Sequence, residues 1–334
     1  MPEDPASGVM SSNDVDVRGR PGVGSALVRA NDWNDPAWQK TADAWVTARL
    51  AALGTPSTGP IERFRVRPWS VTHRTRTAAG PRWFKANVTS CRYEAALADA
   101  LSRIAPGATL PPLAVDTDRG WLLTADAGPT LREVPSSPEI MLQRYAELQL
   151  TVAPHAPGLL ALGVPDQRVT RLPALLATTL ADPRIRDAVN PAVLTMTTRF
   201  GEWCAELAAD GLPPTIQHDD LHDGNVFADL RFFDWGDASI AHPFGSLLVA
   251  FNVLHDAPAP ADLPRLRDAY LEPWSAHADM PTLRRSATLA CRVTRLSRAL
   301  SWQRALHHAA LPLDDSHRAA PVAWLDELPA DTTI

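Results

Sequence analysis

The stretch that decides the fold runs from Thr215 to Asp237 and reads Thr-Ile-Gln-His-Asp-Asp-Leu-His-Asp-Gly-Asn-Val-Phe-Ala-Asp-Leu-Arg-Phe-Phe-Asp-Trp-Gly-Asp. It contains the spacing H-x-D-x-x-x-x-N, formed by His218, Asp220 and Asn225, and then Asp234-Trp-Gly. Between Asn225 and Asp234, two apolar pairs flank a polar turn, which predicts a β-hairpin. Such a hairpin would hold Asn225 and Asp234 at neighbouring strand ends.

Phosphoryl transfer needs this set of side chains. Mg²⁺ must neutralise a triphosphate through oxygen ligands, while a carboxylate accepts the proton of the attacking hydroxyl. We expect Asn225 and Asp234 to be the metal ligands and Asp220 to be the catalytic carboxylate. Gly224 permits the tight loop between them. We count His218 with the catalytic residues, as the group that braces the loop rather than one that reacts.

Other interpretations of the same residues stay open at this point. The stretch could be a polar turn whose side chains only cap backbone hydrogen bonds. His218, Asp220, His222 and Asp223 also look like the His/Asp metal cluster of a hydrolase. A hydrolase site usually takes further ligands from other loops, and the sequence identifies none. A catalytically silent nucleotide-binding module on the same fold is a further alternative.

The residues before this stretch predict an antiparallel sheet with an internal helix. An amphipathic helix is expected first, from Asp35 to Gly54, because an N-cap aspartate precedes a proline there. Another helix is indicated by the apolar repeat that begins at Tyr93 and ends at Ile104. Strand-like runs of β-branched and aromatic residues lie at 64–66, 71–77, 83–88, 113–116 and 121–124.

The residues after Gly128 predict a mainly helical region. A helix is expected to begin at Ser137-Pro138, and further helices are expected at 173–181, 190–210, 244–256, 262–278 and 281–309. We therefore divide the chain into a flexible tail (1–26), an N-terminal lobe (27–126) and a C-terminal lobe (127–334).

Composition and charge narrow the class of protein. The chain has 334 residues and a formal net charge of -6, so it lacks the basic field that binding to nucleic acid requires. Its longest apolar stretch, Phe244 to Leu254, is too short to cross a bilayer, and its first residues do not resemble a signal peptide. The three cysteines show no metal-binding spacing. We expect a cytoplasmic protein, monomeric or homodimeric, without a membrane or nucleic-acid partner.

The Thr215–Asp237 stretch resembles the catalytic loop and metal-binding motif of aminoglycoside phosphotransferases, choline kinases and related protein-kinase-like small-molecule kinases. Trp83-Phe-Lys-Ala86 resembles the strand of that family whose lysine contacts the nucleotide phosphates, and Tyr93-Glu94 resembles the helix whose glutamate pairs with this lysine. Residues 121–128 resemble the strand and hinge over which adenine lies. Together these pieces cover residues of about 60 to 250.

The resemblance implies an α+β fold with two kinase-like lobes, with ATP and Mg²⁺ in the cleft between them. It also implies a small-molecule substrate with a hydroxyl group as the phosphate acceptor. Asp99 remains an alternative to Glu94 as the partner of the lysine. The nucleotide-binding residues that the resemblance implies are Lys85, Glu94, Ser70, Leu123, Thr124, Ala125 and Asp126.

The chain departs from the family pattern at two places. No glycine-rich G-x-G-x-x-G precedes Lys85, and Trp69-Ser70-Val71-Thr72 occupies that turn. Many relatives carry an aspartate shortly after the D-x-G motif that steadies the catalytic loop, whereas this chain reads His242-Pro-Phe-Gly-Ser246. Another group must then support the loop.

The acceptor is the least defined part of the prediction. Antibiotic inactivation, as in aminoglycoside phosphorylation, and metabolic phosphorylation of an amino alcohol, sugar or amino acid both stay open. Arg292, Arg295 and Arg298 recur every three residues, so they share one side of a helix and either pair with neighbouring carboxylates or bind an anionic substrate. Acidic residues that could bind a cationic acceptor are Asp237, Asp256, Asp262, Asp268 and Glu272.

Overall fold

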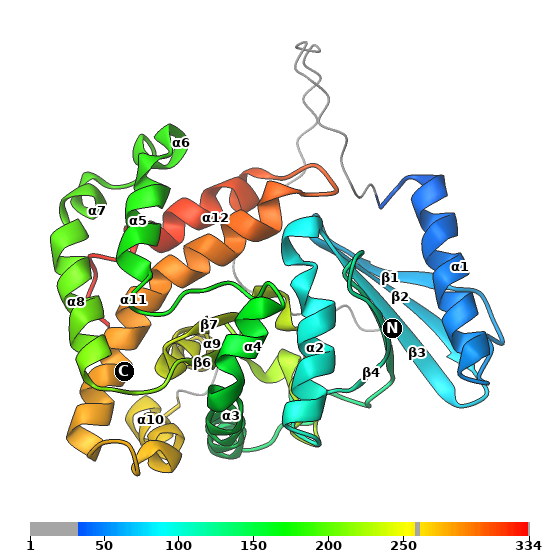
Figure 1. Cartoon of the computed structure of the whole chain (residues 1–334), viewed down its shortest axis with the longest axis horizontal. Helices are drawn as coiled ribbons and strands as arrows, with labels where there is room; N and C mark the ends of the chain where they lie inside the picture. Colours follow the sequence, from blue (N-terminus) through cyan, green and yellow to red (C-terminus); the bar gives the residue numbers. More distant parts are fainter. Residues whose placement is uncertain (1–32, 258–260, 333–334) are drawn as a thin grey trace.

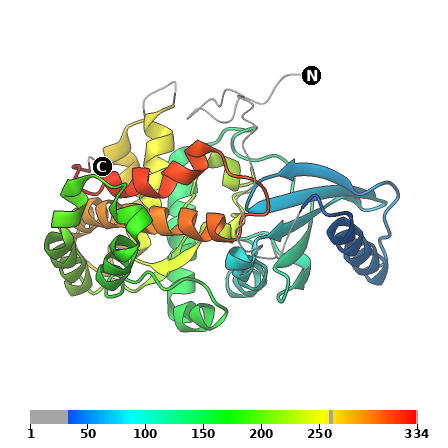
Figure 2. The ribbon, with the colours of Figure 1, turned by 90° about the horizontal axis from the view of Figure 1, so that it is seen from above.

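The computed structural model describes residues 33–257 and 261–332, and the tail predicted for residues 1–26 lies outside them. A lobe built on an antiparallel sheet is followed by a larger lobe that is mainly helical (Figure 1). This is the α+β, kinase-like arrangement that the sequence predicts. The two lobes meet along the segment that carries the catalytic motif, as the view from above also shows (Figure 2).

The sheet of the N-terminal lobe has five antiparallel strands in the order β1-β2-β3-β5-β4. Their positions agree with the expected runs to within about three residues. The register places Lys85 of β3 opposite Thr72 of β2 and Leu122 of β5. The strands are β1 (Glu62–Val66), β2 (Ser70–Thr77), β3 (Gly80–Asn87), β4 (Pro112–Asp116) and β5 (Trp121–Ala125).

The two faces of this sheet have different partners. Helix α1 (Pro36–Ala52) covers one face, and α2 (Tyr93–Ile104) lies on the other (Figure 1). Directly paired residues of neighbouring strands point to the same face. Phe84, which contacts Trp45 of α1, therefore shares its face with Leu123. Lys85 alternates with Phe84, so it points to the α2 face and toward the second lobe.

The C-terminal lobe differs from the predicted helices in several places. The helix expected at 190–210 divides at Met196, which ends one helix and precedes the next. The short α4 and α6, and the longer α12, have no counterpart among the predicted helices. The helices are α3 (Pro138–Val152), α4 (Ala156–Ala161), α5 (Leu172–Ala181), α6 (Pro183–Arg186), α7 (Pro191–Thr195), α8 (Thr197–Ala209), α9 (Leu247–His255), α10 (Leu263–Leu271), α11 (Met280–His307) and α12 (Asp315–Asp326). Among the described residues, no helix combines the length and the apolar character that crossing a membrane requires.

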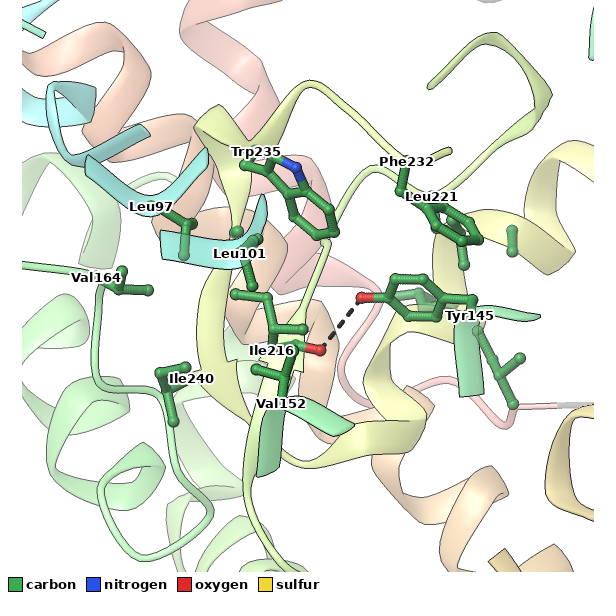
Figure 3. Close-up of a cluster of buried hydrophobic side chains, with 14 of the residues drawn as sticks. Leu97, Leu101, Tyr145, Val152, Val164, Ile216, Leu221, Phe232, Trp235 and Ile240 are labelled. Carbon is green, nitrogen blue, oxygen red and sulfur yellow. Dashed lines mark hydrogen bonds between the residues drawn. The ribbon is translucent and has the colours of Figure 1, made fainter. Parts of the chain in front are cut away.

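The catalytic segment is held in place by a small sheet and an apolar core. Strand β6 (Thr215–Gln217) leads into the segment and pairs with β7 (Ser239–Ala241), which follows it. Figure 3 shows the buried side chains around this point, where residues of α2 approach Trp235 and Ile216. The Tyr145 hydroxyl donates to the Ile216 carbonyl oxygen at 3.2 Å. The core of the second lobe therefore reaches the base of the catalytic loop.

A second contact between the lobes lies at the turn between β1 and β2. The Trp69 ring lies 5.4 Å from Trp302 of α11 and 5.1 Å from His317 of α12, measured between ring centroids. The backbone N–H of Ala310 donates to the Pro68 carbonyl oxygen at 2.6 Å. We call these five residues the aromatic bridge. It ties the turn that stands in place of a glycine-rich loop to the C-terminal helices.

Candidate active site

The predicted hairpin after the catalytic loop is present. The N–H of Phe227 donates to the Arg231 carbonyl oxygen at 3.0 Å, and the N–H of Phe233 donates to the Asn225 carbonyl oxygen at 3.2 Å. Asn225 therefore lies opposite the residue that precedes Asp234. Asp234 has a left-handed backbone, with φ of 64°. The two expected metal ligands thus lie at adjacent strand ends.

Asp220 is held from three directions. The Asn225 side-chain amide donates to the Asp220 backbone oxygen at 2.9 Å and to Oδ2 at 3.1 Å. Nε2 of His222 lies 3.6 Å from Oδ2, and Nη2 of Arg298 lies 3.7 Å from Oδ1. Burial raises the pKa of Asp220, but His222 and Arg298 outweigh it and hold this pKa well below its usual range. The carboxylate is therefore ionised at neutral pH.

Lys85 bridges the two lobes through carboxylates. Its Nζ lies 2.5 Å from Oδ1 of Asp234 and 2.7 Å from Oε2 of Glu94. The N–H of Trp235 also donates to Glu94 Oε1, at 3.0 Å. Glu94 is thus the partner of Lys85, whereas Asp99 pairs with Arg103. A single buried glutamate organises both the lysine and the Asp-Trp-Gly turn.

The charges of this group follow from burial and proximity. Burial favours the neutral amine of Lys85, but Asp234 and Glu94 outweigh it and keep the lysine pKa above its ordinary value. Burial also works against ionised Asp234, and Lys85 overcomes this effect, so the Asp234 pKa is lowered. For Glu94, burial dominates and raises the pKa despite the nearby lysine. Lys85 is therefore cationic and Asp234 anionic at neutral pH.

Gly236 lies close to the side chains that meet at the start of α2. A Cβ on this residue would lie 3.2 Å from Oε2 of Glu94 and 3.8 Å from Nζ of Lys85. The Tyr93 hydroxyl donates to the Gly236 carbonyl oxygen at 2.5 Å and to that of Ala238 at 3.1 Å. The first turn of α2 is therefore hydrogen-bonded directly to the Asp234-Trp-Gly turn and the residues after it.

His218 contacts the segment that follows the hairpin turn. Its Nε2 contacts the Phe233 carbonyl oxygen at 2.9 Å, and its ring centroid lies 4.7 Å from that of Trp235. Burial lowers the pKa of His218, which favours the neutral ring. The ring connects the catalytic loop to the far strand of the hairpin. It makes no contact with Asp220 that would suit proton transfer.

Ser246 supplies the support that the missing aspartate would give. Its hydroxyl accepts a hydrogen bond from the backbone N–H of His218 at 3.3 Å and lies 3.3 Å from the Tyr145 hydroxyl. Gln149 continues this network by donating to the backbone oxygens of Ile216 at 2.8 Å and Pro243 at 2.9 Å. No sequence pattern signals this replacement, because the partners come from α3 and from the strand before the loop.

The predicted nucleotide-binding residues 123–126 are consecutive: they form the end of β5, which pairs with β3, and the start of the hinge. Thr124 pairs with Trp83, and Ala125 pairs with Arg82. Asp126 accepts a hydrogen bond from the indole N–H of Trp83 at 3.0 Å. The side chain of Leu123 faces α1, so only its backbone can contribute to the cleft.

Two residues that sequence reasoning does not single out share the face of Lys85. They are Trp83, two residues earlier on β3, and Leu122, which is paired with Lys85. Ser70 begins β2 opposite Asn87, two residues before Thr72, the partner of Lys85. The alternation of side chains along β3 is the signal that could have identified Trp83.

The His/Asp cluster of a hydrolase does not form. His218 is directed at a backbone oxygen, and Nδ1 of His222 accepts a hydrogen bond from the N–H of Gly224 at 2.9 Å. Asp223 pairs with Arg132 at 2.7 Å. Over residues 33–257 and 261–332, the structure has no group of three or more His, Cys, Asp or Glu residues suited to a metal ion.

Mg²⁺ fits the oxygen donors that remain. It is usually bound by one or two protein ligands and completed by waters and substrate phosphates. Asn225 uses its amide nitrogen toward Asp220, which leaves its side-chain oxygen available as a metal ligand, and the Asp234 carboxylate would be the second protein ligand.

Comparison with known families decides the assignment. The sequence model of a phosphotransferase enzyme family matches residues 82–285, more than half of the chain. The chain belongs to the phosphotransferase enzyme family. The match begins in the strand of Lys85, includes the catalytic loop and Asp234, and ends within α11. The protein is therefore a phosphotransferase, an enzyme that transfers a phosphoryl group.

Solved structures share the fold of the phosphotransferase. A choline/ethanolamine kinase family protein from Mesorhizobium loti is 18% identical, with a TM-score of 0.58 over 86% of this chain and 93% of that one. The GDP complex of aminoglycoside 2'-phosphotransferase-IIIa is 15% identical, with a TM-score of 0.58 over 86% and 98% of the chains. Macrolide 2'-phosphotransferase MphH from Brachybacterium faecium is 18% identical, with a TM-score of 0.54 over 84% and 98%. No curated protein matches the chain at a significant level.

Proposed function

We propose that the phosphotransferase moves the γ-phosphoryl group of ATP to a hydroxyl group of a small molecule. The observation that supports this proposal is the Lys85 bridge, which joins Glu94 of the first lobe to Asp234 of the second. A hydrolase or a polar turn has no need for a half-buried lysine between two carboxylates of different lobes. A phosphate-binding site does, because the ammonium group can bind the nucleotide while both carboxylates hold it in place.

Each residue then has a defined task. Lys85 would contact the phosphates, and Asn225 and Asp234 would hold Mg²⁺, which when bound neutralises the charge of the triphosphate. Asp220 would orient the acceptor hydroxyl and receive its proton. Little covalent chemistry is asked of the protein in this reaction, so the rate depends on how rigidly these groups are placed.

Three of the five carboxylates that could bind a cationic acceptor are engaged by other groups of the protein. Asp268 lies 2.7 Å from Arg284, and Asp262 accepts a hydrogen bond from the N–H of Arg265 as the cap of α10. Asp237 lies 3.7 Å from Arg298. These three groups already have partners inside the protein. We therefore infer that metabolic phosphorylation of a neutral or singly charged alcohol fits better than modification of an aminoglycoside.

A screen for release of the nucleoside diphosphate, ADP from ATP or GDP from GTP, tests the proposal. Mg-ATP and Mg-GTP are offered with aminoglycosides, macrolides, choline, homoserine and simple sugars. ATP-dependent turnover of an alcohol is expected, with sugars, choline or homoserine ahead of aminoglycosides. Failure to bind any nucleotide in the presence of Mg²⁺ would refute the assignment.

Replacement of the catalytic carboxylate gives a sharper test. Asp220→Asn should abolish phosphorylation, because the amide cannot accept the hydroxyl proton. It should leave nucleotide affinity within a few fold, because Asp220 is not needed to bind ATP. Calorimetric titration with Mg-ATP, alongside steady-state turnover, separates the two effects. An equal loss of binding and turnover would contradict the role given to Asp220.

A further inference from the structure

Arg298 brings the C-terminal helices into the catalytic site. It lies on α11 and is 6% exposed, which is unusual for a charged side chain. Its Nη2 is 3.7 Å from Oδ1 of Asp220, and its Nη1 is 3.7 Å from Oδ2 of Asp237. One guanidinium group therefore spans the catalytic loop and the segment that follows the metal-binding motif.

The surroundings of Arg298 fix its orientation. Nη1 also donates to the Ser301 hydroxyl at 3.3 Å, and the guanidinium carbon lies 5.7 Å from the centre of the Trp324 ring of α12. A planar guanidinium group can stack on an aromatic ring while its edge faces two carboxylates, which an ammonium group cannot do. Its Nε is buried and has no hydrogen-bond partner. Burying a guanidinium group while one of its N–H groups has no hydrogen-bond partner costs free energy, so Arg298 is unlike the arginines that only keep a surface soluble.

The two oxygens of Asp220 are held by different groups. Asn225 of the loop itself donates to Oδ2, whereas Arg298 of α11 faces Oδ1. The separation of 3.7 Å exceeds that of a direct hydrogen bond, so Arg298 acts on this oxygen mainly through its charge. Without the charge of Arg298, the carboxylates of Asp220 and Asp237 would repel each other, and both would repel Asp234.

We propose that Arg298 is a positioning residue of the phosphotransfer reaction, which holds the Asp220 carboxylate in line for the acceptor hydroxyl by bridging it to Asp237. This inference rests on the proposed function. The ion pairs of Arg298 are with Asp220 and Asp237, whereas those of Lys85 are with Glu94 and Asp234. Loss of Arg298 is therefore expected to affect turnover and to leave nucleotide binding intact.

Substitutions at this position test the inference. Arg298→Gln keeps polar groups but removes the charge, and Arg298→Lys keeps the charge but cannot reach both carboxylates at once. Arg292→Gln is the matched control, because Arg292 lies on the same helix and pairs with Asp331 instead. Each variant is compared with the wild type for ADP release from Mg-ATP, with the best acceptor or with water, for KM of ATP and for melting temperature.

The expected changes separate turnover from nucleotide binding. Arg298→Gln should lower kcat by about 10²-fold, the loss that follows from misplacing a reacting group by roughly 1 Å. KM for ATP should stay within about threefold, Arg298→Lys should recover part of kcat, and Arg292→Gln should match the wild type.

Several outcomes would contradict the role of Arg298. Wild-type kcat in Arg298→Gln would overturn the inference. A parallel fall in kcat, ATP affinity and melting temperature would also overturn it, because it would show a purely structural role. If Arg298→Gln does not fold, Arg298→Lys decides the matter, and an unchanged kcat in that variant counts against bridging. Absence of nucleotide binding and turnover in the wild type would instead refute the proposed function.

Discussion

Lys85 has one carboxylate partner in each lobe, and this arrangement makes it hard to replace. Lys85→Met should weaken Mg-ATP binding by about 1.5–3 kcal/mol, the usual contribution of a hydrogen bond to a charged group. The protein contains only one other lysine, Lys40, which is exposed on α1. Lys40→Met is therefore a matched control and should bind Mg-ATP normally in calorimetric titration. Equal affinities of the two variants would exclude Lys85 from the nucleotide site.

At the level of residues, the sequence predicts partners that belong to one motif and fails for partners that do not. Glu94 follows Lys85 closely in a familiar pattern, so the sequence predicts their pairing. Arg298 stands out in the sequence only as one of several arginines on one side of a helix. Its pairing with Asp220 depends on how α11 crosses the lobe, and no spacing in the sequence encodes that crossing.

Gly245 shows how tightly the elements around the catalytic loop are packed. A Cβ at this position would collide with Oε1 of Gln217 and Oγ1 of Thr294. Gly245→Ala should therefore lower the free energy of unfolding by about 1–3 kcal/mol, as overpacking in a core does. Gly201 lies inside α8, and no atom of another element lies within 4 Å of the position that its Cβ would take, so Gly201→Ala is the control and should be neutral or stabilising. Urea unfolding of both variants checks this, and an undisturbed Gly245→Ala protein would contradict the described packing.

The contact between β2 and α1 should make stability depend on pH. His73 is 2% exposed, both ring nitrogens lack a hydrogen-bond partner, and burial together with Arg63 lowers its pKa to about 4. The unfolded chain, with the ordinary histidine pKa of about 6.5, binds a proton that the folded chain does not. Stability should therefore fall as the pH drops from about 6.5 to about 4.

His73→Phe should remove this part of the pH dependence, whereas substitution of the exposed His155 by Gln should leave it in place. Urea unfolding at several pH values in this window measures the difference. A slope that His73→Phe does not change would assign the effect to groups other than His73. Asp43, whose Oδ1 lies 3.8 Å from Nδ1 of His73, acts in the opposite direction, because burial raises its pKa and the folded chain therefore takes up a proton more readily than the unfolded chain.

At the level of elements, periodicity locates the long helices and the strands of the main sheet, but not the short or irregular elements. Strands β6 and β7 have three residues each, too few to show alternation. Helix α12 contains Pro321, which disfavours a helix in isolation, and it gains stability by packing on α11. These elements form because of tertiary contacts, so the local sequence does not predict them.

For the molecule as a whole, the aromatic bridge should couple the stability of the two lobes. Trp69→Ala and Trp302→Ala each remove one side of the contact between the rings. In a double-mutant cycle, the coupling energy should be about 0.5–1.5 kcal/mol, the range for an aromatic pair. Urea unfolding of both single variants and the double variant gives this value. Strictly additive effects would show that the lobes do not communicate through these rings.

The aromatic bridge also restricts how the N-terminal lobe can move. The backbone of Asp126, where the chain passes between lobes, is bonded to Pro81 near one end of β3, and that of Trp69 is bonded to Val88 just past the other end. The first turn of α2, which lies on one face of the sheet and is hydrogen-bonded to the Asp234-Trp-Gly turn and the residues after it, adds an attachment that is off the line joining these two. A body held at three points that do not share a line cannot rotate, so any movement of one lobe against the other requires at least one of these contacts to open.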